Sequence, residues 1–385
     1  MVSADPVRVS RLMSSSRSSR WKSSFAKLCK RSALILGALL LCAFIALLAA
    51  RALRQHQSNA ARHIVVPPGA DALEPVRLGG IEQWIRIRGH DRARPVLLFL
   101  HGGPGIPEMP FAYINAELEK HFVVVQWDQR GAGKSFSSDI PAESMRLEQL
   151  LSDGRELVHL LRGRFAQDRI FLAGHSTGSI LGVLLAQQEP QLFRAYIGIS
   201  QAANLETSES LLYAFALRAA EAARDRKALA RLREIGAPPF SNAKQLQISQ
   251  KWVNKFAPDR FGAISFERLR LLFFSPEYSL ADAVRLARGA KFSFEHLWRE
   301  FFAVDLFQQA PRLEMAVFFM EGRHDHVVTS EVAEEYFHAL DAPAGKQLFW
   351  FEHSAHWPQL DEPKKFQQLM VEKVLKETDD GRPSG

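Results

Sequence analysis

The sequence predicts an α/β fold in which helices cover both faces of a mostly parallel β-sheet. From about residue 75, short apolar runs of strand length alternate with helical stretches, a pattern typical of such a sheet. Residues 203–305 interrupt this alternation, because they have almost no strand pattern and resemble successive amphipathic helices. Residues 33–50 carry no charge and predict one transmembrane helix ahead of the folded body.

Length, composition and charge restrict the classes of protein to consider. A chain of 385 residues suits one large α/β domain with an insertion and a tail, and 47% hydrophobic residues indicate a globular body. The net charge of +7 lies entirely in residues 1–31, so the rest of the chain is neutral and predicts no nucleic-acid partner. Both cysteines, Cys29 and Cys42, precede the body, which therefore has no disulfide or thiolate zinc site. We expect no metal and no cofactor.

The N-terminal segment predicts a membrane anchor. As a helix, residues 33–50 would be about 27 Å long, close to the thickness of a bilayer core. The basic tail 1–31 should remain cytoplasmic, so residues 32–51 form a single-pass signal anchor and the body lies on the outer, periplasmic or extracytoplasmic side. Cleavage near Ala50-Arg51-Ala52 and secretion is the alternative. A lipoprotein is disfavoured, because Leu41 precedes Cys42.

The remaining chain divides into segments of different pattern. Residues 52–74 lack periodicity and predict a linker, residues 75–202 and 306–378 form the two parts of the α/β core, and residues 379–385 form a flexible tail. The first part begins with a hairpin around Gly79-Gly80. Further strands are predicted at 96–100, 122–127, 170–173, 196–200, 316–320 and 348–351, with helices near 143–165, 178–188, 330–340 and 363–376. We expect the helical block 203–305 to cap the carboxyl edge of the sheet, where open α/β sheets bind ligands.

Gly174-His175-Ser176-Thr177-Gly178 follows one of these strands and opens a helix. A nucleophile elbow has this context, because its strained turn exposes a serine hydroxyl at the start of a helix and needs small flanking residues. Ser176 is therefore the candidate nucleophile.

His101-Gly102-Gly103-Pro104-Gly105 follows the strand at 96–100. Acyl transfer needs two donors aimed at a developing oxyanion, and we assign them to the backbone N–H groups of Gly103 and Thr177. An ordinary Gly/Pro turn is the alternative.

Asp325 and His356 follow the last two predicted strands, so both should lie near the elbow. A serine hydroxyl needs a base within hydrogen-bond reach, and that base needs a fixed tautomer. The chain order Ser176, Asp325, His356 is the order of the triad that accompanies this type of elbow.

Other residues of the sequence could also fill these roles. His353 could replace His356 as the base, and Asp128 could replace Asp325 as the acid, although we expect Asp128 to fix its own loop. The cluster of His324, Asp325, His326, His353 and His356 could hold a metal, but this would leave the elbow unexplained. Gly133-Lys134-Ser135 does not end a phosphate-binding loop, because position 128 is Asp where that loop needs glycine.

Together these motifs resemble the proline iminopeptidase-like branch of the α/β-hydrolase superfamily across residues 75–375. The resemblance rests on the elbow, on the segments 101–105, 127–135 and 322–325, and on His356 with Asp361-Glu362-Pro363 behind it. It implies the α/β-hydrolase fold with a helical cap that shapes the substrate pocket, and a triad of Ser176, Asp325 and His356. The chain departs from the family elbow, Gly-Gly-Ser-Trp-Gly, at His175 and Thr177. Family members also hold the substrate's α-amino group with acidic cap residues, for which the candidates are Glu206, Glu209, Glu221 and Asp225.

The predicted function is that of a serine hydrolase, which cleaves an amide or ester bond of a small molecule or short peptide through an acyl-enzyme on Ser176. Proline iminopeptidase-like aminopeptidase activity and carboxylesterase or lipase-like activity both fit. A non-catalytic α/β-hydrolase scaffold that binds a ligand is the alternative from another class. Epoxide hydrolase and dehalogenase chemistry is disfavoured, because both use a carboxylate nucleophile and this elbow presents a serine. The sequence makes no prediction of oligomeric state.

Overall fold

The computed structural model describes residues 6–257 and 266–378, with side chains described from residue 29 except at 258–267. The chain divides into two compact units, residues 1–60 and 61–385. The predicted flexible tail 379–385 lies outside the described residues.

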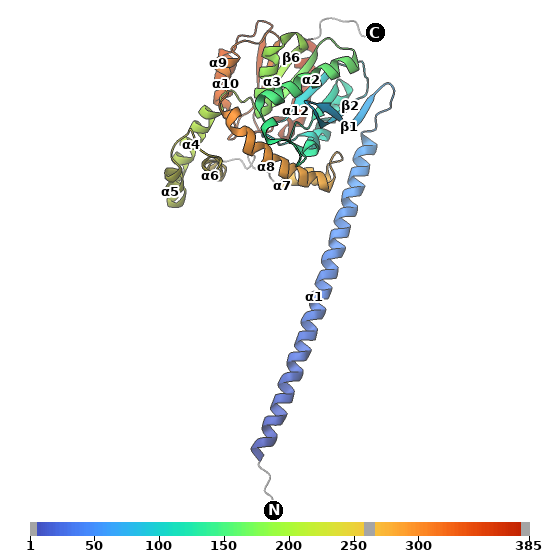
Figure 1. Ribbon diagram of the computed structural model, residues 1–385, viewed down its shortest axis with the longest axis vertical. Coiled ribbons are helices and arrows are strands. Elements are labelled where there is room, and N and C mark those ends of the chain that lie inside the picture. Colours follow the sequence, from blue (N-terminus) through green and yellow to red (C-terminus); the bar gives the residue numbers. More distant parts are fainter. Residues whose placement is uncertain (1–5, 258–265, 379–385) are drawn as a thin grey trace, which may run out of the picture. The chain divides into compact units, whose positions relative to one another are not determined.

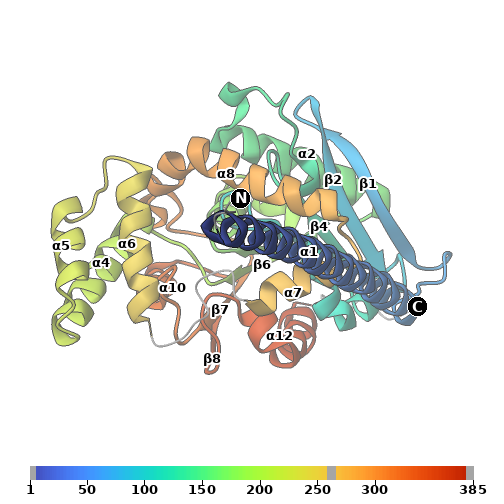
Figure 2. The same ribbon diagram turned by 90° about the horizontal axis from the view of Figure 1, so that it is seen from below.

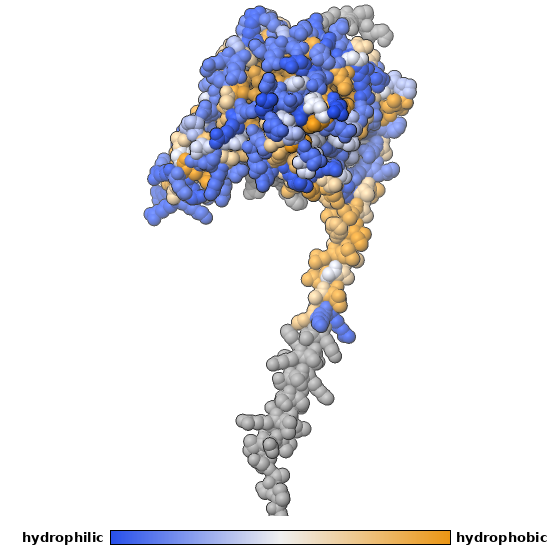
Figure 3. Space-filling view, in the orientation of Figure 1, coloured by the Kyte–Doolittle hydropathy of each residue, from blue (hydrophilic) through white to orange (hydrophobic). Residues whose placement is uncertain are grey.

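The first unit consists of helix α1, Pro6–Ala61. Its segment Cys29–Ala61 is long and apolar enough to cross a membrane, and none of its most apolar stretch is buried. Figure 3 shows hydrophobic side chains along this part of the helix, whereas the visible face of the body is mostly hydrophilic. A long apolar helix around residues 33–50 is thus present as the sequence predicts.

The predicted linker 52–74 is wrong at both of its ends. Helix α1 continues to Ala61, because residues 52–61 contain Ala, Leu, Arg and Gln, which favour helix, and no proline or glycine. Strand β1 already begins at Ala70, whose hairpin partner is Gly89. The sequence did not show this pairing, because residues 70–74 gain their strand character from the neighbouring strand.

The second unit is built on an eight-stranded sheet with the order β1-β2-β4-β3-β5-β6-β7-β8 (Figures 1 and 2). β1, β2 and β4 pair antiparallel, and all pairs from β4 to β8 are parallel, which confirms the mostly parallel sheet. The strands span Ala70–Leu78, Ile81–Gly89, Val96–Leu100, Val123–Trp127, Ile170–His175, Phe193–Ile199, Ala316–Gly322 and Lys346–Phe351, from β1 to β8.

Helices cover both faces of this sheet. Leu98 and Leu100 of β3 pack in one hydrophobic core with α2 (Leu147–Phe165), α3 (Thr177–Gln188) and α10 (Ser330–Ala339). Leu97 and Phe99, which point to the opposite side as alternation requires, pack with η1 (Met109–Lys120), α12 (Pro363–Leu369) and η5 (Met370–Leu375). Shorter helices are η2 (Gly133–Ser135), η3 (Ala142–Ser144), η4 (Pro190–Leu192), α9 (Leu306–Gln309) and α11 (Pro358–Asp361).

In its described residues, the insertion between β6 and β7 consists of helices joined by turns and loops, as the sequence predicts. It contains α4 (Leu205–Ala222), α5 (Arg226–Ile235), α6 (Ala243–Phe256), α7 (Phe266–Phe274) and α8 (Leu280–Phe302). Four of these helices start at a side chain that accepts a backbone N–H, namely Asn204, Asp225, Asn242 and Ser279. Helices α4 and α5 are separated by a turn at Arg224, whose φ is 51°. Helices α4, α5 and α6 project from one end of the body and share a small core of their own (Figures 1 and 2).

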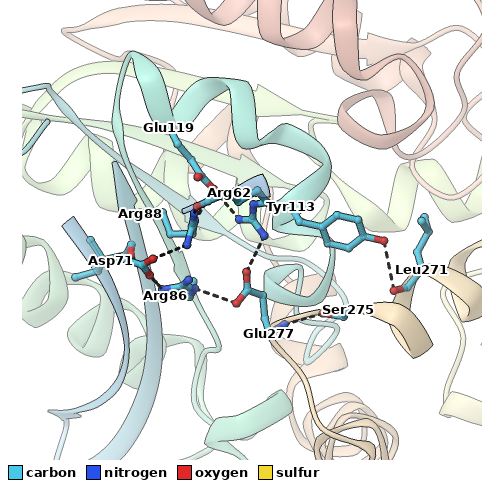
Figure 4. Close-up of polar contacts among 10 residues, drawn as sticks. Arg62, Asp71, Arg86, Arg88, Tyr113, Glu119, Leu271, Ser275 and Glu277 are labelled. Atoms are coloured by element: carbon cyan, nitrogen blue, oxygen red, sulfur yellow. Dashed lines mark hydrogen bonds and ion pairs between the residues drawn. The ribbon is translucent and has the colours of Figure 1, made fainter. Parts of the chain in front are cut away.

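An arginine–carboxylate ring joins the start of the body to the insertion (Figure 4). Three arginines alternate with three carboxylates around it, with N–O distances from 2.5 to 3.1 Å, in the pairs Arg62–Glu119, Glu119–Arg88, Arg88–Asp71, Asp71–Arg86, Arg86–Glu277 and Glu277–Arg62. Its members come from the residue after α1, the β1–β2 hairpin, η1 and the segment between α7 and α8. The ring therefore fixes Arg62 to the body, instead of leaving a free linker there.

Replacing Glu277 should show what the ring contributes. Glu277→Gln leaves Arg62 and Arg86 each short of one carboxylate in a site that is largely shielded from water. We expect the free energy of unfolding to fall by about 3 kcal/mol. Chemical denaturation of the full-length chain in detergent measures it.

Glu314→Gln is the matched control, because Glu314 forms an exposed pair with Arg312. Exposed pairs contribute little, so this variant should remain close to the wild type. Equal denaturation midpoints for the two variants would contradict a stabilising role for the ring.

Candidate active site

The elbow is a strained turn between β5 and α3. β5 ends at His175, α3 begins at Thr177, and Ser176 between them has φ 55° and ψ −126°. A positive φ is costly for serine and persists only where the surroundings enforce it. A Cβ on Gly178 would lie 2.3 Å from the carbonyl oxygen of Leu100, and one on Gly174 would lie 2.5 Å from that of Gly178. The predicted strand–turn–helix context is confirmed, and both glycines are required by close backbone contacts.

The glycine-rich turn after β3 lies against this serine. A Cβ built on Gly102 would be 2.6 Å from the Cβ of Ser176. Gly103 and Thr177, the two predicted oxyanion donors, line the same small cavity as Ser176, with a volume of about 60 Å³. The structure thus brings these three residues together at one cavity.

Asp325 lies in the loop after β7 and is hydrogen-bonded on both oxygens. Its Oδ1 accepts the N–H groups of Val327 (2.8 Å) and Val328 (3.0 Å), and its Oδ2 lies 2.8 Å from Nδ1 of His356. Burial opposes ionisation, but His356 and the two N–H groups outweigh it and lower the pKa of Asp325 below its usual range. This carboxylate can therefore hold a proton on Nδ1, which leaves Nε2 as the basic nitrogen of His356.

His356 lies in the loop after β8, beside the residue that precedes the serine. Its ring centroid is 4.8 Å from that of His175, and its backbone carbonyl accepts a hydrogen bond from the hydroxyl of Ser200 (3.2 Å). Burial lowers the pKa of His356; Asp325 acts in the opposite direction, and the charges of His175 and Arg268 act with burial. A neutral imidazole with a free proton acceptor can serve as a general base.

The alternative acid and base lie elsewhere. His353 is exposed, and its backbone N–H donates to Glu362 (3.0 Å). Asp128 is fully buried and accepts the N–H of Lys134 (2.8 Å) and the hydroxyl of Tyr278, which agrees with its expected role in its own loop. Burial raises the pKa of Asp128 to about 7.

The histidines around Asp325 do not form a metal cluster. His324 is exposed and His326 is half-buried, and each ring lies within hydrogen-bond distance of a backbone carbonyl. Over residues 29–257 and 268–378, no group of three or more His, Cys, Asp or Glu side chains could hold a metal ion.

The four candidate acids of the cap differ in burial and in their partners. Glu206 is exposed, Glu221 pairs with Arg233, and Asp225 caps α5 and pairs with Lys255. Glu209 differs, because it is only 3% exposed and lines the cavity of Ser176. Within the described part of the chain, its Oε1 has no hydrogen-bond partner. Burial raises the pKa of Glu209 to about 7, although Ser249 and Gln250 beside it act in the opposite direction.

The sequence does not predict one buried pair, which lies beside His356. Nδ1 of His175 lies 2.7 Å from Oε1 of Glu108, and its Nε2 lies 2.6 Å from the carbonyl oxygen of His356. His175 was noted as a departure from the family elbow, but Glu108 was not singled out. No local pattern links two residues that are 67 positions apart, so the sequence contained no signal for this contact.

Comparisons with known proteins show the family and the fold. A family model described as the alpha/beta hydrolase fold matches residues 95–363. Over 298 residues the chain is 34% identical to the probable aminopeptidase YbaC of Bacillus subtilis strain 168, which covers 76% of this chain and 93% of that protein. A proline iminopeptidase of Lactobacillus delbrueckii subsp. bulgaricus is 32% identical over 121 residues, 31% of this chain and 40% of that protein.

A crystal structure of proline iminopeptidase from Mycobacterium smegmatis has the same fold, with a TM-score of 0.56. Its sequence is 18% identical, and the match covers 80% of this chain and 99% of that one.

Substituting the elbow glycines should destabilise the body. Gly178→Ala places a methyl group 2.3 Å from a backbone oxygen, so the turn must shift. We expect the unfolding free energy to fall by about 3 kcal/mol, as measured by urea denaturation of the full-length chain in detergent.

Gly163→Ala is the control, because Gly163 lies in helix α2 with nothing within 4 Å of an added Cβ. Alanine favours helix, so this variant should be as stable as the wild type or more stable by up to about 1 kcal/mol. A Gly178→Ala protein as stable as Gly163→Ala would disprove the steric requirement at the elbow.

Proposed function

We propose that this chain, which belongs to the α/β-hydrolase fold family and to its proline iminopeptidase-like branch, is a serine aminopeptidase. It removes an N-terminal residue from a short peptide or amide through an acyl-enzyme on Ser176. The hydrogen-bonded pair of Asp325 and His356 beside the elbow supports the serine hydrolase mechanism. The buried carboxylate of Glu209 at the same cavity favours an aminopeptidase over an esterase.

In the proposed reaction, the hydroxyl of Ser176 attacks the scissile carbonyl and its proton passes to Nε2 of His356. Asp325 stabilises the imidazolium that forms and keeps its orientation. The N–H groups of Gly103 and Thr177 donate to the oxyanion of the tetrahedral intermediate. His356 then gives its proton to the leaving amine, and water hydrolyses the acyl-enzyme by the same steps.

Glu209 supports a substrate with a free amino group. A buried carboxylate oxygen without a partner is costly, and a substrate ammonium group would satisfy it with a charge-assisted hydrogen bond. The similar protein from Bacillus subtilis is likewise named a probable aminopeptidase.

The N-terminal helix supports a membrane location for this activity. We propose that the apolar residues 33–50 within Cys29–Ala61 anchor the chain as a single-pass helix, with the basic residues 1–31 in the cytoplasm and the catalytic body outside. Cleavage of the segment as a signal peptide would release the same body as a secreted enzyme.

A fluorophosphonate probe tests the nucleophile. The full-length chain in detergent should be labelled, and Ser176→Ala should abolish labelling because no activated hydroxyl remains. Ser210→Ala, which removes an exposed hydroxyl of α4, should be labelled as the wild type is. Absence of labelling in the folded wild type would favour a non-catalytic scaffold, and labelling of Ser176→Ala would place the nucleophile elsewhere.

Substrate choice tests the role of Glu209. Glu209→Gln should lower kcat/KM for proline arylamide by about 10- to 100-fold, since a hydrogen bond to a charged group contributes about 1.5–3 kcal/mol. Short acyl arylesters, which lack the amino group, should be unaffected. Glu206→Gln is the control, because Glu206 is exposed.

The pH dependence of KM gives a further readout of the same carboxylate. Protonation of Glu209 as the pH falls through about 7 should raise KM for the amine substrate in the wild type and not in Glu209→Gln. A wild type that turns over esters alone would contradict the aminopeptidase proposal and favour an esterase.

A further inference from the structure

We infer that His175 is a charged positioning residue for the proposed reaction. It is an imidazolium held by Glu108, which fixes the backbone of His356 and keeps the ring of His356 neutral. The inference rests on the serine hydrolase mechanism proposed above and adds a second histidine to it.

The hydrogen-bond partners of His175 fix its protonation. Its Nε2 faces the carbonyl oxygen of His356 at 2.6 Å, and a carbonyl can only accept, so Nε2 carries a proton. Its Nδ1 faces Oε1 of Glu108 at 2.7 Å, while the amide of Gln359 donates to the other oxygen, Oε2, at 3.0 Å. The lowered pKa of Glu108 indicates that it is ionised, so Oε1 accepts as well and the second proton lies on Nδ1 of His175.

The charges of the pair support each other in a buried site. Burial disfavours the charged imidazole, but Glu108 outweighs it and raises the pKa of His175. Burial likewise disfavours the carboxylate, but His175 outweighs it and lowers the pKa of Glu108. Both side chains are more than nine-tenths buried, so water screens the pair only weakly.

This cation acts on the catalytic base in two ways. The first is mechanical, because the N–H of His175 and the hydroxyl of Ser200 both donate to the carbonyl of His356 and hold its loop. The second is electrostatic, because the two rings lie 4.8 Å apart and a second positive charge beside an existing one is disfavoured. The base therefore stays neutral, and able to accept a proton, into mildly acidic pH.

The other charged or titratable groups around this pair do not cancel the effect. Asp325 raises the pKa of His356, whereas burial and the charges of His175 and Arg268 lower it, with a net lowering. Burial lowers the pKa of the nearby His101 to about 4, so that ring is neutral at working pH. The facing groups come from five places, namely Glu108 before η1, His101 after β3, Asp325 after β7, Arg268 of α7 and His175 of β5.

The variant His175→Gln separates charge from hydrogen bonding, because glutamine keeps an N–H donor for the carbonyl of His356 and carries no charge. The readout is the rate of Ser176 phosphonylation by an uncharged fluorophosphonate, measured against pH with the full-length chain in detergent. Removing the cation should move the acid limb of this profile upward by about one pH unit, with the alkaline plateau within a few-fold of the wild type. Arg312→Gln, which removes an exposed positive charge, should leave the limb in place.

Each outcome has a separate meaning. An acid limb that stays in place in His175→Gln, with or without a lower plateau, overturns the electrostatic role. A wild type that is not labelled at any pH refutes the hydrolase proposal instead.

A second measurement covers a variant that fails to fold. In wild-type protein with ¹⁵N-labelled histidine, NMR at a pH where the exposed histidines are neutral should still show one doubly protonated ring, because the pKa of His175 is raised. Neutral rings throughout at that pH would overturn the inference.

Discussion

The backbone of Ser176 sets the constraint on which the rest of the site depends. Ser176 has a φ of 55° and lines the cavity. This backbone conformation is enforced by close packing of β5, α3 and the turn after β3. Gly102, Gly174 and Gly178 make this possible, since a side chain on any of them would meet a neighbouring atom at less than 3 Å. The strain is located where the proposed chemistry occurs and is supported by the most buried part of the sheet.

Near this turn, two buried histidines each lie within hydrogen-bond distance of a buried carboxylate. In the proposed state Asp325 and Glu108 are negative, the ring of His356 is neutral and His175 is positive. Asp325 lies 2.8 Å from the ring of His356, Glu108 lies 2.7 Å from the ring of His175, and Nε2 of His175 lies 2.6 Å from the backbone carbonyl of His356. A buried charge is tolerated only when it is paired, and each charge here has its partner. The proposed mechanism gives the two histidines different tasks, because His356 accepts a proton during the reaction while His175 stays protonated.

The helical insertion lines part of the cavity of Ser176. Its helices α4 and α6 place Glu209, Leu246 and Gln250 at the cavity, opposite the residues of the sheet edge. At its other end, Glu277 joins the arginine–carboxylate ring with the β1–β2 hairpin and η1. The insertion is thus tied to the core by ion pairs on one side and contributes a carboxylate to the cavity on the other.

The sequence by itself determined the features that are local. The elbow, the glycine-rich turn, the apolar helix and most strands depend on residues close together in the chain, and the order of Ser176, Asp325 and His356 follows from their strand ends. Tertiary structure alone decided which cap acid faces the cavity, because four glutamates and aspartates of similar sequence context differ only in what packs against them. It also joined His175 to Glu108 and Arg62 to Glu277, which are 67 and 215 positions apart. Contacts over such separations leave no periodicity or spacing in the chain. The same reason explains the mistaken linker at 52–74, whose last residues become a strand by pairing with β2.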